Sequence, residues 1–290
     1  MKKTALELSA GNYEVKTGLQ ESGEIGELAG AMDILSERLL LAEKERKDME
    51  QMRNDFFANV SHELRTPITV MRAYTETLID GVVRDEDKKR QYYDKMLGEC
   101  KSMQRLVGDL LTISKMQNPD FEVEKESVSI GEIFEDVLDS AGAMAASRGI
   151  TINKYKNGVL MEDVFDEEYS EEATLISGDY ERLRQMFMVI VDNAVKFSYD
   201  GGNVDISLTE EGDRVYISIR DHGIGIAEEE LPFIFDKFYK SKLRQNSKGS
   251  GLGLAISREI CRKHDGSLEV KSKPGEGTEF IFGFKRIVRI

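Results

Sequence analysis

The chain reads Phe56-Phe57-Ala58-Asn59-Val60-Ser61-His62-Glu63-Leu64-Arg65-Thr66-Pro67 within a long segment that favours helix. From residue 24 to about 117 there is a single proline and few glycines, and apolar residues recur at heptad spacing. The first such seam comprises Ile25, Leu28, Met32, Leu35 and Leu39. The register weakens at Ala42 and Arg46 and then resumes at Met49, which is typical of a stutter between two helical modules.

A second helix is expected after this one. Asp80-Gly81 should end the first helix, and the charged stretch 84–90 leads into the next, where Met96, Met103 and Leu110 recur every seven residues. Two long helices with a short connection predict a helical hairpin, and heptad faces this apolar usually pair with a partner. We therefore expect a dimeric four-helix bundle. The alternative is a single hairpin that packs on its own second domain.

The pattern changes after Asn118-Pro119 to a mixture of strands and helices. Alternating apolar residues predict strands at 150–154, 202–208, 215–219, 268–270 and 279–284. Helices fit at 131–146, 180–197 and 252–264. Strands and helices joined by short links predict an α+β sandwich. The acidic run 162–172 is expected to be a solvated loop rather than a metal site.

Composition narrows the functional class. The 290 residues carry a formal net charge of −14, which argues against a nucleic-acid binder, because such a protein needs a basic face. The longest apolar run, 186–191, is too short to span a bilayer, and the first residues do not resemble a signal peptide. Cys100 and Cys261 form no CxxC pair, so we expect a soluble chain of a reducing compartment.

His62 is the first candidate for chemistry. At 100° per residue, Val60 and Leu64 flank one direction and His62 points roughly opposite, which places its ring on the solvent face. An exposed, uncharged imidazole is a competent nucleophile at neutral pH. Glu63 beside it can accept the proton that the ring sheds, and Thr66 one turn later can hold a water. Pro67 should leave the Glu63 carbonyl without its helical partner and bend the helix.

Three glycine clusters mark a second candidate site. They read Asp221-His222-Gly223-Ile224-Gly225, Gly249-Ser250-Gly251-Leu252-Gly253 and Gly275-Glu276-Gly277-Thr278. None is a Walker motif or a dinucleotide-binding fingerprint, and each alone is compatible with a simple turn. However, 249–253 opens directly into a predicted helix, so its backbone N–H groups would face a bound phosphate. Asp221, at the end of a predicted strand, can accept a hydrogen bond from an amino group such as that of adenine.

The predicted helix 180–197 supplies the opposite wall. Its core stripe is Leu183, Phe187, Ile190, Ala194 and Phe197, and its second stripe is Gln185, Val189, Asn193 and Lys196. In the second stripe, Asn193 offers an oxygen to Mg²⁺ and Lys196 offers a positive charge to phosphates. An ordinary surface amide is the alternative interpretation of Asn193.

Together these segments resemble the cytoplasmic part of a sensor histidine kinase of two-component signalling, over nearly the whole chain. Residues 56–67 resemble the H-box, with His62 at the phosphoacceptor position. Val191-Asp192-Asn193-Ala194-Val195-Lys196-Phe197-Ser198 resembles the N-box, Phe235-Asp236-Lys237-Phe238-Tyr239 the F-box, and the glycine clusters the three G-boxes. Residues 24–28 resemble the second half of a HAMP module, the relay from a transmembrane helix in this family.

The resemblance implies a mechanism. ATP and Mg²⁺ bind in a Bergerat-type pocket of a GHKL-type ATPase domain, His62 takes the γ-phosphoryl group with Glu63 as base, and the group passes to an aspartate of a response regulator receiver domain. The Glu63-x-x-Thr66 pattern implies phosphatase activity towards that regulator. The ATP lid would lie at about 239–248. The implied nucleotide site comprises Asn193, Lys196, Asp221, Gly223, Gly225, Lys240, Gly249, Gly251, Gly253 and Thr278, with Asn193 as metal ligand.

The resemblance also implies an organisation and a location. Residues 1–45 would form a partial HAMP module and signalling helix, 46–122 the dimerisation and phosphotransfer hairpin of a homodimer, and 123–290 the catalytic ATP-binding domain. The chain would be the cytoplasmic portion of an inner-membrane sensor, with contact to the membrane only through a segment before these residues.

Four positions depart from the family pattern. His222 replaces the usual Asn of the first glycine box, Phe197 stands where Tyr also occurs, and Lys240 stands where Arg is frequent, so that its phosphate contact would not be forked. Val189 replaces the first Asn of the N-box, which weakens the expected magnesium binding. Val189 is also the best support for a different class, a pseudokinase scaffold that signals by conformation. A clamp-type ATPase with the same pocket is the other alternative, although the H-box helix has no place there.

Overall fold

The computed structural model describes residues 1–19, 23–118, 120–161, 174–241 and 249–287. The acidic run 162–172 therefore lies outside the described residues. By its internal contacts the chain divides into two compact units, Met1–Thr66 and Pro67–Ile290. No helix among the described residues has both the length and the apolar character needed to cross a bilayer.

The first unit begins with a short helix that the sequence pattern did not predict. Helix α1 (Lys2–Ser9) is followed by a connector and by α2 (Glu24–Ile79), a single unbroken helix that passes through the stutter. The connector is tied to α2, because Thr17 N donates to the Asp33 carboxylate at 2.6 Å. The hydroxyl of Ser36 lies 2.7 Å from the carbonyl oxygens of both Tyr13 and Val15.

The helical hairpin prediction is confirmed. Helix α2 ends at Ile79, two residues before Gly81 adopts a left-handed φ of 65°, and α3 (Glu86–Met116) begins after the N-cap Asp85, which accepts from Lys88 N at 3.0 Å. The end of α2 packs on α3, where the rings of Tyr74 and Tyr92 lie 4.8 Å apart.

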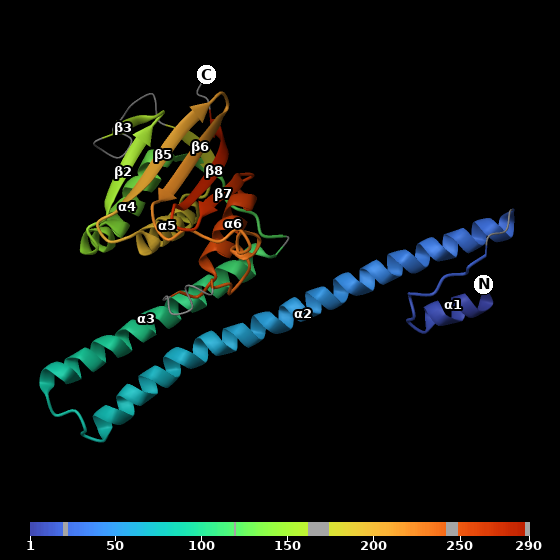
Figure 1. The fold of residues 1–290 in the computed structure, drawn as a ribbon, viewed down its shortest axis with the longest axis horizontal. Coiled ribbons are helices and arrows are strands. Elements are labelled where there is room, and N and C mark those ends of the chain that lie inside the picture. The colour runs from blue at the N-terminus through green and yellow to red at the C-terminus, as the bar shows by residue number, and fades with distance from the viewer. Residues whose placement is uncertain (20–22, 119, 162–173, 242–248, 288–290) are drawn as a thin grey trace. The chain divides into compact units, whose positions relative to one another are not determined.

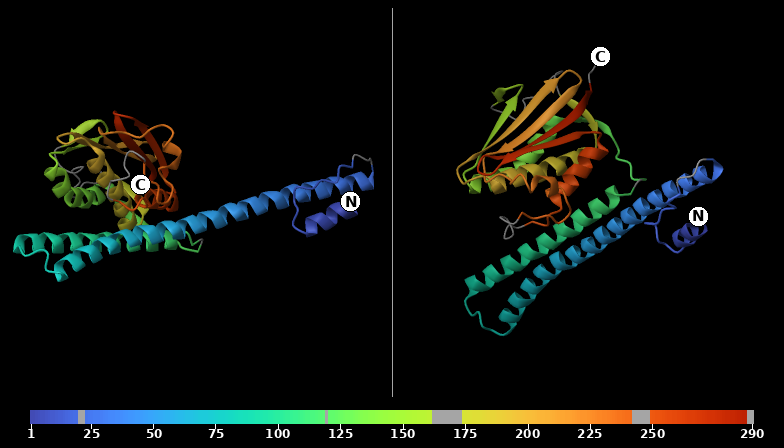
Figure 2. Two further views of the ribbon diagram at one scale, coloured as in Figure 1. Left: turned by 60° about the horizontal axis from the view of Figure 1, so that its bottom comes forward. Right: turned by 45° about the vertical axis from the view of Figure 1, so that its right-hand side comes forward.

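The remainder of the chain is an eight-stranded sheet covered by helices on one face (Figures 1 and 2). The strands are β1 (Glu126–Ser129), β2 (Thr151–Lys156), β3 (Val159–Met161), β4 (Leu175–Gly178), β5 (Asn203–Glu211), β6 (Arg214–Asp221), β7 (Ser267–Lys273) and β8 (Gly277–Ile287). Their order is β1-β4-β8-β6-β5-β2-β3, and β7 also pairs with β8. All pairings are antiparallel except that of β2 with β5.

Three helices cover this sheet: α4 (Ile130–Ser147), α5 (Tyr180–Phe197) and α6 (Gly253–Lys263) (Figure 1). A short 3-10 helix, η1 (Leu231–Phe233), lies between β6 and α6 in sequence. Phenylalanines join the two layers, since the Phe187 ring of α5 lies 4.8 Å from Phe134 of α4 and 5.3 Å from Phe282 of β8. All three side chains are fully buried. The α+β sandwich is thus confirmed, and β1, β3 and β4 are the strands that the pattern missed.

Candidate active site

His62 lies on the exposed side of α2, as the helical periodicity predicted. Thr66, one turn later, is also exposed, and its hydroxyl donates to the His62 carbonyl at 3.3 Å. Glu63 is half-buried. Pro67 is buried and lies inside α2, which continues to Ile79, so the proline does not end the helix. His62 therefore offers its ring to water, with a carboxylate and a hydroxyl nearby on the same helix.

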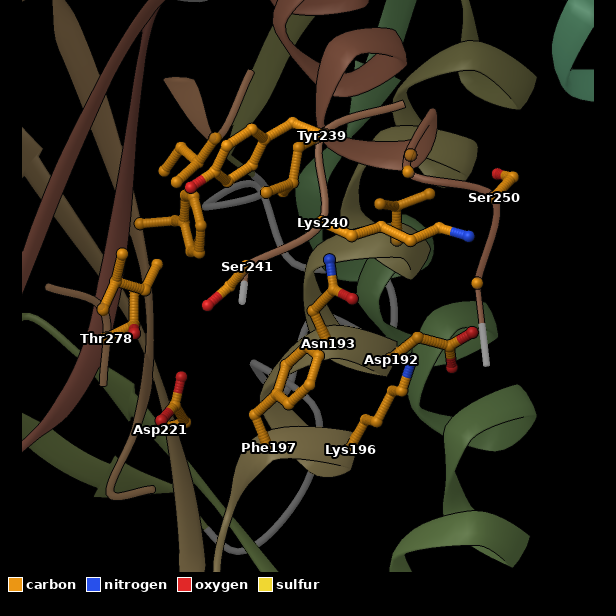
Figure 3. Close-up of a pocket in the computed structure, with 18 of the residues that line it drawn as sticks. Asp192, Asn193, Lys196, Phe197, Asp221, Tyr239, Lys240, Ser241, Ser250 and Thr278 are labelled. Atoms are coloured by element: carbon orange, nitrogen blue, oxygen red, sulfur yellow. The ribbon is translucent and has the colours of Figure 1, made fainter. Parts of the chain in front are cut away.

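The second unit contains a cavity of about 390 Å³ beside α5 (Figure 3). Its walls come from α5, the end of β6, the start of β8, the segment 239–241 and the glycine turn before α6. Eight of the ten predicted nucleotide-binding residues line it: Asn193, Lys196, Asp221, Lys240, Gly249, Gly251, Gly253 and Thr278. The structure thus brings these eight residues together around one cavity, although they are far apart in the chain.

Helix α5 begins after Asp179, whose carboxylate accepts from Arg182 N at 3.0 Å. Asn193 and Lys196 project into it (Figure 3). Asp192 also lines it, and burial raises the pKa of this carboxyl, an effect that the nearby cations oppose. Phe197, which we predicted as part of the core stripe, instead lines the cavity, because the stripe ends where α5 ends.

The glycine turn 249–253 leads directly into α6. Among the described residues, no side chain caps the start of α6, so the backbone N–H groups of its first turn can face a ligand at the cavity wall formed by Gly253 and Leu254. The ammonium of Lys196 lies beside the same turn, since a Cβ added to Gly249 would lie 3.5 Å from Lys196 Nζ. Partial positive charge from the helix and full charge from the lysine therefore meet at one end of the cavity.

Asp221 lies at the other end of the cavity, where β6 ends. It is buried, and its carboxylate accepts from Gly223 N at 2.9 Å. Close backbone contacts require glycine at two positions near Asp221. A Cβ on Gly223 would lie 1.9 Å from the Phe197 carbonyl oxygen, and a Cβ on Gly277 would lie 1.9 Å from the Asp221 carbonyl oxygen. Gly223 and Gly225 do not line the cavity and instead allow the chain to pack closely behind it.

His222, which departs from the family pattern, points elsewhere. Its Nε2 lies 2.7 Å from the Asp205 carboxylate, and it does not line the cavity. Tyr239 of the F-box and the two residues after it, Lys240 and Ser241, contribute to the wall, and the Ser241 hydroxyl donates to Glu230 at 2.8 Å. The rest of the predicted lid, 242–248, lies outside the described residues.

Helix α3 adds two charged residues that sequence reasoning missed. Arg105 and Asp109 line the cavity, and the Ser250 hydroxyl of the glycine turn donates to Asp109 at 3.1 Å. Burial raises the pKa of Asp109, while the bond from Ser250 opposes that effect. Nothing in the heptad pattern separates these two residues from other charged positions of α3, so only the tertiary structure reveals them.

Val189 lines the cavity one turn before Asn193. It packs against the glycine turn, because a Cβ on Gly253 would lie 2.8 Å from Val189 Cγ1. Among the described residues, no cluster of three or more His, Cys, Asp or Glu side chains could hold a metal ion.

Two protein-family models match this chain, one in the long helices and one in the region that contains the cavity. A family model described as "Histidine kinase-, DNA gyrase B-, and HSP90-like ATPase" matches residues 178–287, and one described as "His Kinase A (phospho-acceptor) domain" matches residues 52–119. The sensor protein SrrB of Staphylococcus aureus (strain N315) is 32% identical over 284 residues, which are 95% of this chain and 44% of SrrB. The chain thus spans less than half the length of this curated relative.

Solved structures share the fold. The histidine kinase AdeS of Acinetobacter baumannii matches with a TM-score of 0.61 and 24% identity, over 77% of this chain and 97% of that one. The histidine kinase ThkA, solved in complex with the response regulator protein TrrA, matches with a TM-score of 0.62 and 19% identity, over 84% of this chain and 65% of that one. At these identities the likeness describes the fold alone.

Proposed function

Because the chain belongs to the sensor histidine kinases, whose phosphoacceptor and ATPase domains it carries in that order, we propose that it transfers the γ-phosphoryl group of ATP to His62. A ring nitrogen of His62 bonds to the γ-phosphorus while the bond to the bridging oxygen breaks and ADP leaves. Glu63 accepts the proton that the ring releases. The phosphoryl group then passes from His62 to an aspartate carboxylate of a response regulator receiver domain.

The observation that carries this proposal is the two-ended character of the cavity. One end has Lys196 beside the glycine turn and the uncapped start of α6, which suits phosphates. The other end has the buried Asp221 carboxylate, which suits the amino group of adenine. Lys240 and Thr278 also line the cavity. A nucleoside triphosphate has this same polarity, with an amine at one end and charge at the other.

Magnesium fits the phosphate end through few protein ligands. Asn193 projects an amide oxygen into the cavity, whereas Val189 one turn earlier offers no donor (Figure 3). Mg²⁺ keeps water readily and takes phosphate oxygens, so Asn193 would be its main protein ligand. When bound, the ion would neutralise charge on the phosphates.

Phosphatase activity towards the regulator is the second activity that we propose. Thr66 is exposed one turn after His62, where its hydroxyl can orient a water towards a phosphoaspartate. Since Thr66 does not line the cavity, replacing it by Ala should leave autophosphorylation intact and slow regulator dephosphorylation.

We also infer a homodimer formed by helices 49–79 and 91–116. Large apolar side chains on these helices are exposed in the single chain, among them Met52 at 63%, Phe57 at 60% and Leu111 at 58%. Burial of such a surface against a second copy would form the four-helix bundle. Residues 1–45 would act as the relay, 46–122 as the phosphotransfer hairpin and 123–290 as the ATP-binding domain.

The test is incubation of the whole chain with γ-labelled ATP and Mg²⁺. A kinase gives label on the protein that is stable in base and labile in acid, as expected for a phosphoramidate. Release of free phosphate without labelled protein would instead indicate a clamp-type ATPase. Absence of both products would indicate a scaffold that signals by conformation, and either of these results would contradict the proposal.

A further inference from the structure

One arginine from a neighbouring helix holds the C-terminal turn of α5. Arg148 is the C-cap residue of α4. Its guanidinium donates to three carbonyl oxygens of that turn, those of Val195 at 2.5 Å, Lys196 at 2.8 Å and Ser198 at 2.9 Å. Its Nε donates to the Asp200 carboxylate at 2.8 Å. The side chain is 29% exposed, so most of the group is shielded from water.

These bonds complete the hydrogen bonding of the helix end. The last carbonyls of an α-helix have no partner within the helix, and a positive charge there is favourable. Ala194 O accepts from Ser198 N at 3.0 Å, and Phe197 O accepts from Ile224 N at 3.3 Å. Arg148 supplies the partners for residues 195, 196 and 198, so each carbonyl from 194 to 198 is bonded.

The turn that Arg148 holds forms two parts of the nucleotide cavity. The side chains of Lys196 and Phe197 line it directly. Behind the turn, Gly223 packs against the Phe197 carbonyl, and Gly223 N donates to the Asp221 carboxylate at 2.9 Å. The position of the turn therefore sets both the phosphate end, through Lys196, and the opposite end, through Asp221.

We propose that Arg148 is a positioning residue for nucleotide binding, which acts by fixing this turn. The proposal rests on the proposed function, because it assumes that the cavity binds ATP. Arg148 does not line the cavity, so it acts through Lys196 and Asp221 and not on the nucleotide. The planar, five-donor guanidinium can bond several carbonyls at once, which the single ammonium of lysine cannot reproduce.

The test measures the affinity of the whole chain for Mg·ADP by calorimetry. We expect Arg148→Ala to raise the Kd about tenfold, the equivalent of one net charge-assisted hydrogen bond, and Arg148→Lys to raise it roughly threefold. At saturating ATP the rate of autophosphorylation should stay within about twofold of the parent, because Arg148 does not contact the reacting groups. Arg184→Ala is the matched control, since Arg184 lies on α5 and its guanidinium pairs with Glu181 at 3.4 Å.

Rescue separates positioning from general stability. Guanidinium chloride at millimolar concentration, far below denaturing levels, should restore part of the affinity of Arg148→Ala and leave Arg184→Ala unchanged. Unchanged affinity in Arg148→Ala would overturn the proposal. The proposal would also be overturned if guanidinium did not restore the Mg·ADP affinity of Arg148→Ala and if Arg148→Lys lost as much affinity as Arg148→Ala. If Arg148→Ala does not fold, the Kd of Arg148→Lys for Mg·ADP decides. A roughly threefold rise would support the proposal, and an unchanged Kd would overturn it. A parent chain that does not bind Mg·ADP would overturn the proposed function itself, before any variant is compared.

Discussion

Large apolar side chains are mostly buried in the ATPase domain but often exposed on the long helices. In the ATPase domain, Phe187 and Phe282 are 0% exposed and lie between helices and sheet. On α2 and α3, Phe57 is 60% and Leu111 58% exposed. A domain that buries its own aromatic residues is complete as one chain, whereas helices with this much exposed apolar surface need a partner. The difference supports the proposed homodimer, in which the helices bury this surface against a second copy.

The two regions also differ in how they hold their polar groups. Asp221 is buried and bonded at the edge of the cavity, and burial raises the pKa of Asp192 nearby. His62 is exposed on its helix. A partly buried cavity suits the proposed nucleotide binding, and an exposed ring suits access by the two proposed partners, ATP and a response regulator.

Removal of the carboxylate beside His62 should affect chemistry alone. We expect Glu63→Ala to slow autophosphorylation by a factor of about 10²–10⁴, the usual size of a general-base effect, with no change in Mg·ADP affinity. The rate is measured with γ-labelled ATP under single-turnover conditions. Glu76→Ala is the matched control, because Glu76 is exposed on the same helix and pairs with Arg72. A slow Glu76 variant, or a Glu63 variant with weakened ADP binding, would count against the role of Glu63.

A charge on the exposed apolar surface of the hairpin should disrupt the dimer. Leu111→Glu places a carboxylate in the proposed interface. We expect the dissociation constant of the dimer to rise at least about tenfold. Val159→Glu is the control, since Val159 is 64% exposed on β3 of the ATPase domain and should leave the dimer intact. Light scattering at tens of micromolar protein measures the molecular mass of each variant in solution. A parent chain that is monomeric there would remove the basis for this interpretation.

Replacement of Val189 should sharpen the magnesium requirement. Val189→Asn adds an amide one turn before Asn193, and we expect half-saturation at roughly threefold to tenfold lower Mg²⁺, because one protein oxygen replaces a water. Autophosphorylation is measured across a Mg²⁺ titration, with Val189→Ala as the control for lost packing on Gly253. Identical titrations for Val189→Asn and the parent would mean that Val189 only packs beneath the cavity.

Acid should destabilise the ATPase domain through His264. This buried ring accepts from Asp179 N at 3.0 Å and bonds the Ile260 carbonyl at 2.7 Å, and burial lowers its pKa. The unfolded chain therefore binds a proton that the folded domain resists, so stability is lost as the pH falls below about 6.5. Each kcal/mol lost should lower the melting temperature by about 2–4 °C.

Thermal unfolding between pH 8 and pH 5 checks this prediction. His264→Gln should flatten the dependence in that range. A parent melting temperature that does not fall towards pH 5 would show that His264 is not the group that titrates.

The elements that the sequence predicts well have local signals. Asp80-Gly81 predicted the end of α2, which ends at Ile79, and α5 has the predicted bounds 180–197, whereas the caps Asp85 and Asp179 were not used in the prediction. Strands β1, β3 and β4 have only three or four residues, too few for a period of two to be distinguished. Helix α1 was missed as well, although it is as long as several of the predicted elements.

The site was predictable where residues share one element and unpredictable where they do not. Asn193 and Lys196 lie on one helical stripe, and the glycine clusters mark close backbone contacts. Phe197 was assigned to the core because a helical stripe does not show where the helix stops covering the sheet. Arg105 lines the cavity and Arg148 bonds the end of α5, but both lie many residues before α5 in the sequence. No sequence spacing therefore connects either of them to α5.

The most direct test of the account is to locate the phosphoryl group itself. The chain has three histidines: the ring of His222 lies 2.7 Å from Asp205, that of His264 is buried, and that of His62 is exposed. After incubation with Mg·ATP, the protein is digested at neutral or basic pH and its peptides are analysed by mass spectrometry. The account predicts phosphoryl on the peptide that contains His62, and none in His62→Gln, which should still bind Mg·ADP like the parent. Phosphoryl on a different residue, or persistent labelling of His62→Gln, would contradict it.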